Sequence, residues 1–374
     1  MIHLSRPDIT EKEIAAVVEV LKSNSLSLGP KVPEFEAAIA KYVGRKYGVA
    51  VNSGTTALYL SLLAMGIKPG DEIITTPFTF IASTNCILMA GAKPVYVDID
   101  PTNLNIDPAR IEAAITPKTK AILPVIVFGN AWGFDKIVEI AKKHNLPILE
   151  DSCEGLGTIY KGTKVGGFGR MSCFGFYPNK QVTTGEGGMI LTDEQELVDI
   201  CVSLRNQGRG KGGGWLAHER LGYNFRLPDI NCALGVVQAT RIDEFRQKRR
   251  KVAQMYQQLL TGEDRLITPQ EPQGGEMSWF VFVIRLANKY SQTHRDHILK
   301  RMFENGVQVS NYFPPVHLQP FIANEYGYKP GDFPITDAVC QRTIALPFHN
   351  NLPESDAKTV VATLKKCLDE ADSL

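Results

Sequence analysis

The chain has no long apolar run and no excess of charge of either sign. No segment approaches the roughly 18 consecutive apolar residues of a membrane-spanning helix, and the opening MIHLSRPDIT lacks the features of a signal peptide. Basic residues number 41 and acidic residues 40, a formal net charge of +1, which gives no bulk attraction for nucleic acid or an acidic membrane. We therefore expect a cytoplasmic protein without a nucleic-acid or membrane partner.

The chain also lacks the cysteine and histidine patterns of metal sites. Its seven cysteines are scattered without a C-x-x-C pair, and its seven histidines show no ligand spacing. This distribution favours a reducing compartment and predicts no metal. Internal repeats and low-complexity segments are missing as well. At 374 residues the chain exceeds one hydrophobic core, so two domains are expected.

Short β-branched runs alternate with helical patterns from about residue 47 to 192. Strand-like YGVAVNS precedes helix-like TTALYLSLLAMG, and similar strand-like runs recur as EIITTP, KPVYVDID, AILPVIVFG and LPILED. These runs are apolar enough to be strands covered on both faces. The pattern predicts a mainly parallel sheet in a three-layer α/β domain.

The remaining sequence predicts a smaller α+β domain at the C-terminus. A long helical pattern starts at Asp229 and becomes strongly charged after Arg241, as expected of a helix that leaves one domain for another. The run MSWFVFVIRL then predicts a strand, and HRDHILKRMFENG predicts a helix. We assign residues 1–245, with the N-terminal segment, to the large domain and residues 246–374 to the small one.

The segment NSGTTA, residues 52–57, lies where a predicted strand ends and a helix begins. Free backbone N–H groups point out of a helix start, Gly54 lets an anion approach closely, and Thr55 and Thr56 add hydroxyls. Ordinary helix capping explains the same residue types, and the Gly-Lys-Ser/Thr ending of a P-loop is missing. Phosphate binding and simple capping both remain open for this segment taken alone.

Two charged residues follow later strand-like runs. Asp151 ends LPILED, where open α/β sheets contact ligands, and there it can hold a cationic ring nitrogen. A turn aspartate, or a carboxylate pair of Asp151 with Glu154 in a hydrolase, are the alternatives. Lys180 lies among aromatics, hydroxyls and glycines in GFYPNKQVTTGEGG. A lysine in a desolvated pocket loses its proton more readily and can attack a carbonyl, whereas an exposed turn lysine has no such role.

A phosphate site, an acidic residue and a lysine, in that order on an α/β domain, form the set that pyridoxal phosphate needs. From LGPKVPEFE to IALPFHNNL the chain resembles the sugar aminotransferases of the DegT/DnrJ/EryC1/StrS group. The resemblance implies the aspartate-aminotransferase (type I) fold and the cofactor pyridoxal 5′-phosphate. It also implies that Asp151 pairs with the cofactor nitrogen, that Lys180 forms the Schiff base, and that Glu154 lies beside the ring. By the same match, Thr55 and Thr56 bind the phosphate, and Phe80 of TPFTFIAST stacks on the ring.

The resemblance further implies a homodimer with shared active sites. In LGYNFRLPDINCALG, Asn224 is expected to touch the partner's cofactor phosphate. Tyr312 and His317 of NYFPPVHLQPF match positions near the nucleotide-sugar in relatives, and the pyrophosphate would be met by His317 and by loop residues near Lys31. A satisfied loop histidine is an equal alternative for His317.

Two segments depart from the pattern of the family. Gly175 stands where relatives usually have a serine whose hydroxyl helps to bind phosphate, so that hydrogen bond must be replaced or forgone. VIVFGNAWGFD replaces a more usual HLYG-type segment. The second departure affects the expected substrate more than the cofactor.

The expected reaction is transfer of the amino group of L-glutamate to C4 of a nucleotide-linked 4-keto-6-deoxy sugar, because TTGEGG resembles the enzymes that aminate C4. Alternatives are a C3 keto-sugar aminotransferase, a cyclitol or antibiotic-precursor aminotransferase, and a non-catalytic regulatory homologue. Sugar dehydratases of the same family replace the lysine with histidine, so Lys180 argues against them. Intact Lys180 and Asp151 argue against the regulatory homologue.

Overall fold

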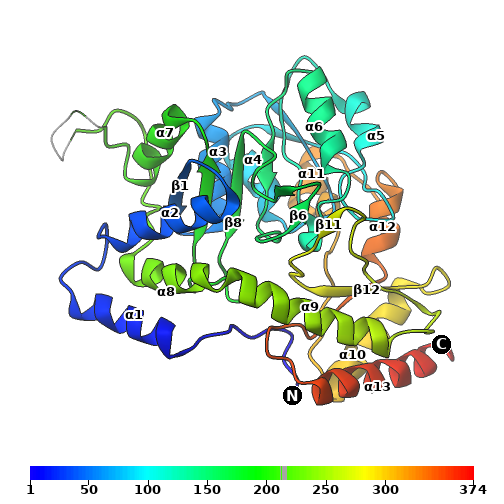
Figure 1. The fold of residues 1–374 in the computed structure, drawn as a ribbon. Helices are drawn as coiled ribbons and strands as arrows, with labels where there is room; N and C mark the ends of the chain where they lie inside the picture. Colours follow the sequence, from blue (N-terminus) through cyan, green and yellow to red (C-terminus); the bar gives the residue numbers. More distant parts are fainter. Residues whose placement is uncertain (211, 213–216) are drawn as a thin grey trace.

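The computed structural model describes residues 1–210, 212 and 217–374, which form a large α/β part and a smaller α+β part (Figure 1). The large part is built on seven strands in the spatial order β3-β2-β4-β5-β8-β9-β1; isolated parallel bridges, Ile122 with Ile148 and Val125 with Asp151, join its two halves. β9 is antiparallel to both of its neighbours, and the other pairings are parallel. The strands are β1 (Tyr47–Val51), β2 (Glu72–Thr75), β3 (Lys93–Tyr96), β4 (Thr119–Ile122), β5 (Leu149–Asp151), β8 (Met171–Gly175) and β9 (Gly188–Thr192).

Both faces of this sheet are covered. Successive strand residues enter different cores: Ile73 and Ile190 pack in one, Ile74 and Leu191 in the other, because side chains alternate across a strand. One face is covered by α3 (Gly54–Ala64), α4 (Ala82–Met89) and α7 (Gln195–Arg205). The other is covered by α2 (Lys31–Val43), α6 (Phe134–Lys143) and α8 (Asp229–Thr240). The predicted three-layer arrangement is confirmed.

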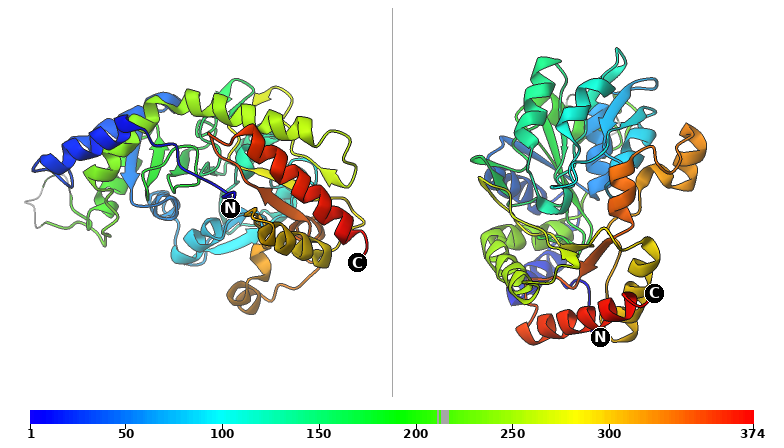
Figure 2. Two further views of the ribbon diagram at one scale, coloured as in Figure 1. Left: turned by 90° about the horizontal axis from the view of Figure 1, so that it is seen from below. Right: turned by 90° about the vertical axis from the view of Figure 1, so that its right-hand side faces the viewer.

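The small part has its own core around an antiparallel sheet of order β10-β12-β13. Ile2 bridges Val307 and packs against this core, so the first residues, assigned above to the large domain, contact the small one. Both views of Figure 2 place the N-terminus beside this part. Its elements are β10 (Leu266–Ile267), β12 (Phe282–Leu286), β13 (Thr343–Leu346), α10 (Gln292–Glu304) and α13 (Glu354–Ala371).

Helix α9 (Ile242–Leu259) connects the two parts. Ile242 and Phe245 belong to a core of the large part, whereas Val252 and Tyr256 belong to the core of the small one. The single long helix predicted from Asp229 is in fact two, because α8 ends before Arg241 and α9 begins after it. The boundary at residues 245 and 246 falls inside α9 and stays a prediction.

Two predicted strands are shorter than expected. The run AILPVIVFG continues into a 3₁₀ turn, Val127–Gly129, in which Phe128 has φ of 56°. The run MSWFVFVIRL becomes a strand only at Phe282, after Trp279 with φ of 24°. In both runs a residue leaves the extended region of φ/ψ space, and both segments approach the cavity described below.

The remaining helices and strands are short or peripheral. They are α1 (Glu11–Lys22), α5 (Pro108–Ile111), β6 (Ile159–Tyr160), β7 (Thr163–Lys164), β11 (Gly275–Glu276), α11 (Pro320–Tyr326) and α12 (Pro334–Cys340), with 3₁₀ turns at Glu112–Ala114 and Val316–Leu318. Across residues 1–210, 212 and 217–374, no helix has the length and apolarity needed to cross a membrane.

Candidate active site

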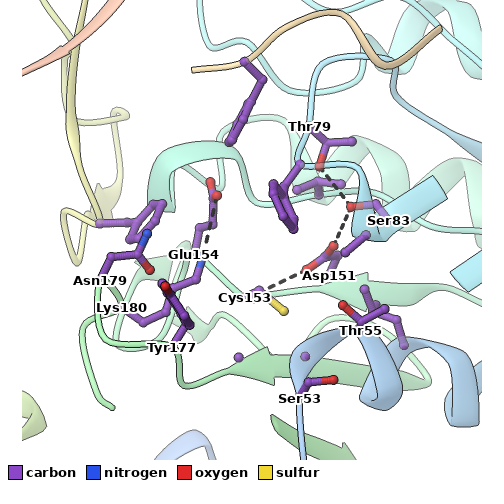
Figure 3. Close-up of a pocket in the computed structure, with 18 of the residues that line it drawn as sticks. Ser53, Thr55, Thr79, Ser83, Asp151, Cys153, Glu154, Tyr177, Asn179 and Lys180 are labelled. Atoms are coloured by element: carbon purple, nitrogen blue, oxygen red, sulfur yellow. Dashed lines mark hydrogen bonds and ion pairs between the residues drawn. The ribbon is translucent and has the colours of Figure 1, made fainter. Parts of the chain in front are cut away.

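A cavity of about 530 Å³ opens where β5 and β8 end, α3 begins, and residues 311–314 approach from the other side (Figure 3). β5 and β8 run parallel, so their carboxyl ends meet at one edge of the sheet, the usual ligand edge of an α/β fold. The volume suits a small-molecule site. Six of the residues predicted from the sequence line the cavity: Thr55, Phe80, Asp151, Glu154, Lys180 and Tyr312.

Asp151 is a buried carboxylate with an ordered set of donors. Its Oδ2 accepts a hydrogen bond of 2.7 Å from the Ser83 hydroxyl, and its Oδ1 accepts one of 3.2 Å from the Cys153 N–H. The Ser83 hydroxyl in turn lies 2.9 Å from that of Thr79. Figure 3 shows this chain of contacts from α4 to the end of β5. Such partners fix the orientation of a carboxylate that lines the cavity, as a group that holds a cationic ring nitrogen must be fixed.

Lys180 lies in the turn between β8 and β9, and its side chain is 16% exposed. Its Nζ is 3.8 Å from Glu154 Oε1 and 4.0 Å from the centroid of the Phe280 ring. Its own N–H donates to the Tyr177 carbonyl at 2.9 Å, which closes the turn. The amine is therefore held between an acidic group and an aromatic face, within the cavity wall.

Glu154 is 5% exposed, and burial raises the pKa of its carboxyl above the ordinary value. The charge of Lys180 and a 2.8 Å hydrogen bond from the Phe128 N–H offset part of that effect. A carboxyl whose charged form is disfavoured beside a lysine can share a proton with it. The arrangement does not support the hydrolase alternative, in which Asp151 and Glu154 act as a pair. Asp151 bonds Ser83, whereas Glu154 lies beside Lys180.

The start of α3 carries a capping box that engages the hydroxyl of Thr56, one of the predicted phosphate ligands. The Ser53 hydroxyl accepts from the Thr56 N–H at 3.1 Å, and the Thr56 hydroxyl bonds Asn52 Oδ1 and the Ser53 carbonyl, both at 2.8 Å. Thr56 is buried and does not line the cavity, so its role as a phosphate ligand stays a prediction. Ser53, Gly54 and Thr55 line the cavity instead, where the first N–H groups of a helix lack helical partners and attract anions.

The glycines beside this helix start differ in what they require. A Cβ on Gly188 would lie 2.2 Å from the Ser53 carbonyl oxygen, so only glycine fits there. The last glycine of TTGEGG therefore allows the backbone of this turn to pack closely against the start of α3. A Cβ on Gly175 would lie 3.5 Å from Cys153 Sγ, an ordinary contact. Gly175 therefore leaves space rather than relieving a clash, and no side-chain hydroxyl reaches the cavity from that position.

Besides Thr56, three predicted residues do not line this cavity. Asn224 is exposed, and its backbone forms an isolated bridge with Asn206. Lys31, at the start of α2, pairs with Glu34 at 2.7 Å. His317 is fully buried, 3.2 Å from Asp337, and stacks edge-on against Phe333. A side chain enclosed in this way does not reach the cavity in this structure, and neither of its ring nitrogens has a hydrogen-bond partner among the described residues. The substrate role of His317 and the alternative of a satisfied loop histidine both stay predictions.

Several lining residues were missed by sequence reasoning. Ser83 follows Phe80 in TPFTFIAST, and a hydroxyl one helical turn beyond a site residue was a usable signal. Phe280 and Asn311 come from segments far along the chain, and no local motif marked them. The missed lining residues that carry polar or aromatic groups include Ser53, Thr79, Ser83, Tyr177, Asn179, Phe280 and Asn311.

The donor set suits pyridoxal phosphate. The helix start with Gly54 and Thr55 is an anion site, Asp151 is a held carboxylate, and Lys180 offers an amine at the same cavity. The ring of Phe80, 60% exposed, is free to stack on a flat heterocycle. No cluster of three or more potential metal ligands occurs among the residues that the structure describes.

Comparisons with known proteins agree with this arrangement. Residues 7–365 match the DegT/DnrJ/EryC1/StrS aminotransferase family. The spore coat polysaccharide biosynthesis protein SpsC of Bacillus subtilis is 38% identical over 98% of this chain and 97% of its own length. GDP-perosamine synthase of Caulobacter vibrioides is 38% identical over 98% of both chains. The PLP form of Spr1654 from Streptococcus pneumoniae superposes with a TM-score of 0.93 at 29% identity, covering 99% of each chain.

Proposed function

Because the chain belongs to the DegT/DnrJ/EryC1/StrS aminotransferase family and is a sugar aminotransferase that uses pyridoxal phosphate on a type I fold, we propose that it aminates C4 of a nucleotide-linked 4-keto-6-deoxy sugar with L-glutamate as donor. The resemblance of TTGEGG to C4-aminating enzymes supports the position. The name of one relative, GDP-perosamine synthase, supports a nucleotide-linked substrate.

One observation carries the proposal: Lys180, Asp151 and the start of α3 line the same cavity. Lys180 would hold the cofactor covalently through Nζ, and Asp151 would keep the ring nitrogen protonated. The N–H groups of Gly54 and Thr55 would bind the phosphate together with the Thr55 hydroxyl, and Phe80 would cover one face of the ring. When bound, pyridoxal phosphate supplies the sink for the electron pair that remains when the C–H bond of the amino donor breaks.

Side chains of the protein carry the proton transfers of the proposed reaction. Once free, Lys180 Nζ removes the proton from Cα of L-glutamate, and in the second half-reaction the same atom delivers a proton to C4 of the sugar. Glu154 Oε1, 3.8 Å away, balances the charge of the amine while it carries the proton. Because 2-oxoglutarate leaves before the sugar reacts, steady-state kinetics should be ping-pong.

The proposed enzyme is a homodimer with shared sites. Asn224 is exposed and does not line the cavity of its own chain, as expected if it serves the partner's cofactor phosphate. Mixing inactive Lys180→Ala with inactive Asn224→Ala protein should restore activity, because some mixed dimers carry one site with neither change. If subunit exchange is proven and no activity returns, Asn224 does not act across the dimer.

The sugar and its pyrophosphate need contacts outside the cofactor site. Tyr312 lines the cavity from the small part and faces the cofactor residues, so we place it against the sugar. The Lys31 side chain is 29% exposed; its ammonium pairs with Glu34, and its backbone N–H donates to Asp229. We place the ammonium against a pyrophosphate bound at the partner's site.

A single-turnover experiment tests the regiochemistry. Enzyme preloaded with the amino group of L-glutamate, and freed from donor by gel filtration, is given 4-keto or 3-keto nucleotide sugars, cyclitol ketones or no acceptor. We expect amination of the 4-keto sugar alone, with nitrogen on C4 by NMR. Amination of the 3-keto sugar alone would refute the C4 assignment, and amination of a cyclitol ketone alone would refute the nucleotide-sugar class.

A further inference from the structure

A buried arginine lies beneath the site without a carboxylate partner. Arg249, on α9, is 2% exposed, and burial lowers its pKa to about 10, so it stays charged at neutral pH. No ion pair to Arg249 occurs within the described residues, and its Nε has no hydrogen-bond partner there. Burying a charge without an ion-pair partner lowers the stability of the fold. A neutral hydrogen-bond donor would therefore be expected at this position unless the guanidinium has a functional role.

All the hydrogen bonds of this guanidinium go to backbone carbonyls around the site. Nη1 donates to the carbonyls of Trp279 at 3.2 Å and Phe280 at 2.9 Å, and Nη2 donates to that of Lys180 at 3.3 Å. The first two belong to the segment that enters β12, and the third belongs to the turn after β8. One planar group therefore joins two segments that are distant in the sequence.

The segment bound by Arg249 contains a residue with an unfavourable backbone conformation. Trp279 has φ of 24°, in a region that non-glycine residues rarely occupy, and such strain persists only where surrounding contacts enforce it. Gln181 adds a second tie: its Nε2 donates to the carbonyls of Glu154 at 2.7 Å and Ser278 at 3.3 Å. The residue after the lysine thus reinforces the same junction.

We propose that Arg249 is a positioning residue, which locks the Lys180 turn to the Phe280 segment so that the lysine amine keeps its place over the Phe280 ring, 4.0 Å from its centroid. This inference rests on the proposed role of Lys180. Because α9 also joins the cores of the two parts, the lock ties the lysine to the junction between them.

The lock itself is tested on cofactor-free protein by amide hydrogen exchange. Arg249→Met removes the donors, and Lys251→Met is the matched control, because Lys251 lies two residues farther along α9 and its side chain is exposed. Exchange in peptides covering 177–181 and 278–281 should become about tenfold faster in Arg249→Met alone. Equal exchange in the two variants would overturn the lock.

The catalytic consequence is tested by a double-mutant cycle. Arg249→Met should lower kcat about 10- to 100-fold, since small misplacements of a reacting group are expensive, with KM for L-glutamate changed by less than about twofold. In Lys180→Ala enzyme supplied with methylamine, the same change should cost less than about twofold, because a free amine needs no positioning. An equal loss in both backgrounds would show general damage and refute the inference.

Two variants guard against a misfolded Arg249→Met. Arg249→Lys keeps a charged donor and should recover part of kcat. Phe280→Leu removes the ring but keeps the carbonyl that Arg249 binds, so it should lower kcat while leaving exchange unchanged; full activity of this variant would refute the positioning role. If borohydride fixes the cofactor to a residue other than Lys180 in the wild type, the proposed function fails and the catalytic role of Arg249 with it, whereas the exchange result still reports the lock.

Discussion

Asp151 and Glu154 at the end of β5 both line the cavity, whereas Tyr312 and His317 from the small part separate: Tyr312 faces the site and His317 is buried against Asp337. Strand pairing places Asp151, and Glu154 follows three residues later in the turn after β5. Asp151 forms the last rung of the β5–β8 ladder, so its position follows from the register of the sheet. After Tyr312 the chain turns away into a 3₁₀ turn and packs on an aromatic cluster.

The difference shows which kind of predicted site residue lines the cavity in the folded protein. A parallel sheet brings the carboxyl ends of its strands to one edge, so a functional residue there is predictable from the strand pattern. A loop residue takes its position from tertiary packing. The rings of Tyr328 and Phe333, 6.2 and 4.8 Å from the His317 ring, come from a later part of the chain and enclose it.

The largest effect that sharpens this comparison is expected at Lys180. Lys180→Ala removes the group that carries the proton, and activity should fall by about 10³-fold or more. Borohydride reduction followed by peptide mass mapping should place the cofactor on Lys180 in the wild type and on no residue in the variant. Lys161→Ala, an exposed lysine paired with Asp135, should behave as the wild type. Cofactor fixed elsewhere would contradict the assignment.

The next effect is expected at Asp151. An amide in Asp151→Asn retains the hydrogen bond from Ser83 but cannot keep the ring nitrogen protonated. The loss should be about 3 kcal/mol of transition-state stabilisation, or about 10²-fold in kcat. Circular dichroism should show an intact fold. Activity within a few-fold of the wild type would mean that Asp151 is not the ring partner.

Much of the large part was predictable because period-2 and period-3.6 patterns are local. β1, β2 and β5 lie within the segments predicted for them, and α3 begins one residue before its predicted segment. The break at Arg241 was not predicted, because the change to strongly charged residues after Arg241 also fits one helix that leaves its domain, and neither glycine nor proline marks the break. The shortening of the strand before Phe282 depends on the backbone of Trp279, which is held by residues of α9 that no sequence window contains.

The site followed the same rule. The motif positions Asp151 and Lys180 line the cavity, whereas Thr56 does not, and its hydroxyl takes part in the capping box, an alternative that the sequence left open. Phe280 could not be found, because a phenylalanine in an apolar run is normally a core residue. Its role depends on the lysine amine above its ring.

A moderate effect is expected at Glu154, on stability. Burial raises its pKa in the folded protein, so the stability that the neutral carboxyl contributes is present below its ordinary value and is lost as pH rises through the folded value. Glu154→Gln stays neutral and keeps an acceptor for the Phe128 N–H. The melting temperature of the cofactor-free variant should exceed that of the wild type by about 2 °C at pH 8, and the gain should vanish near pH 4. Glu186→Gln, at an exposed position on the cavity rim, should show no such trend.

The smallest effect on activity is expected at His317, where the comparison began. Burial lowers the pKa of its imidazole below 6.5, although the carboxylates of Asp337, Asp332 and Asp98 oppose the shift. The unfolded chain therefore takes up a proton more readily, and the stability that the neutral ring contributes is lost as pH falls below about 6.5. His317→Gln can still donate to Asp337 but does not titrate. Its melting temperature should fall less than that of the wild type between pH 7 and pH 5, by about 1–2 °C, while exposed His3→Gln follows the wild type.

The KM of His317→Gln for the nucleotide sugar should change by less than about twofold, because the side chain does not reach the cavity. A tenfold rise in KM with unchanged melting behaviour would return His317 to the substrate site and show that the enclosed position opens during turnover.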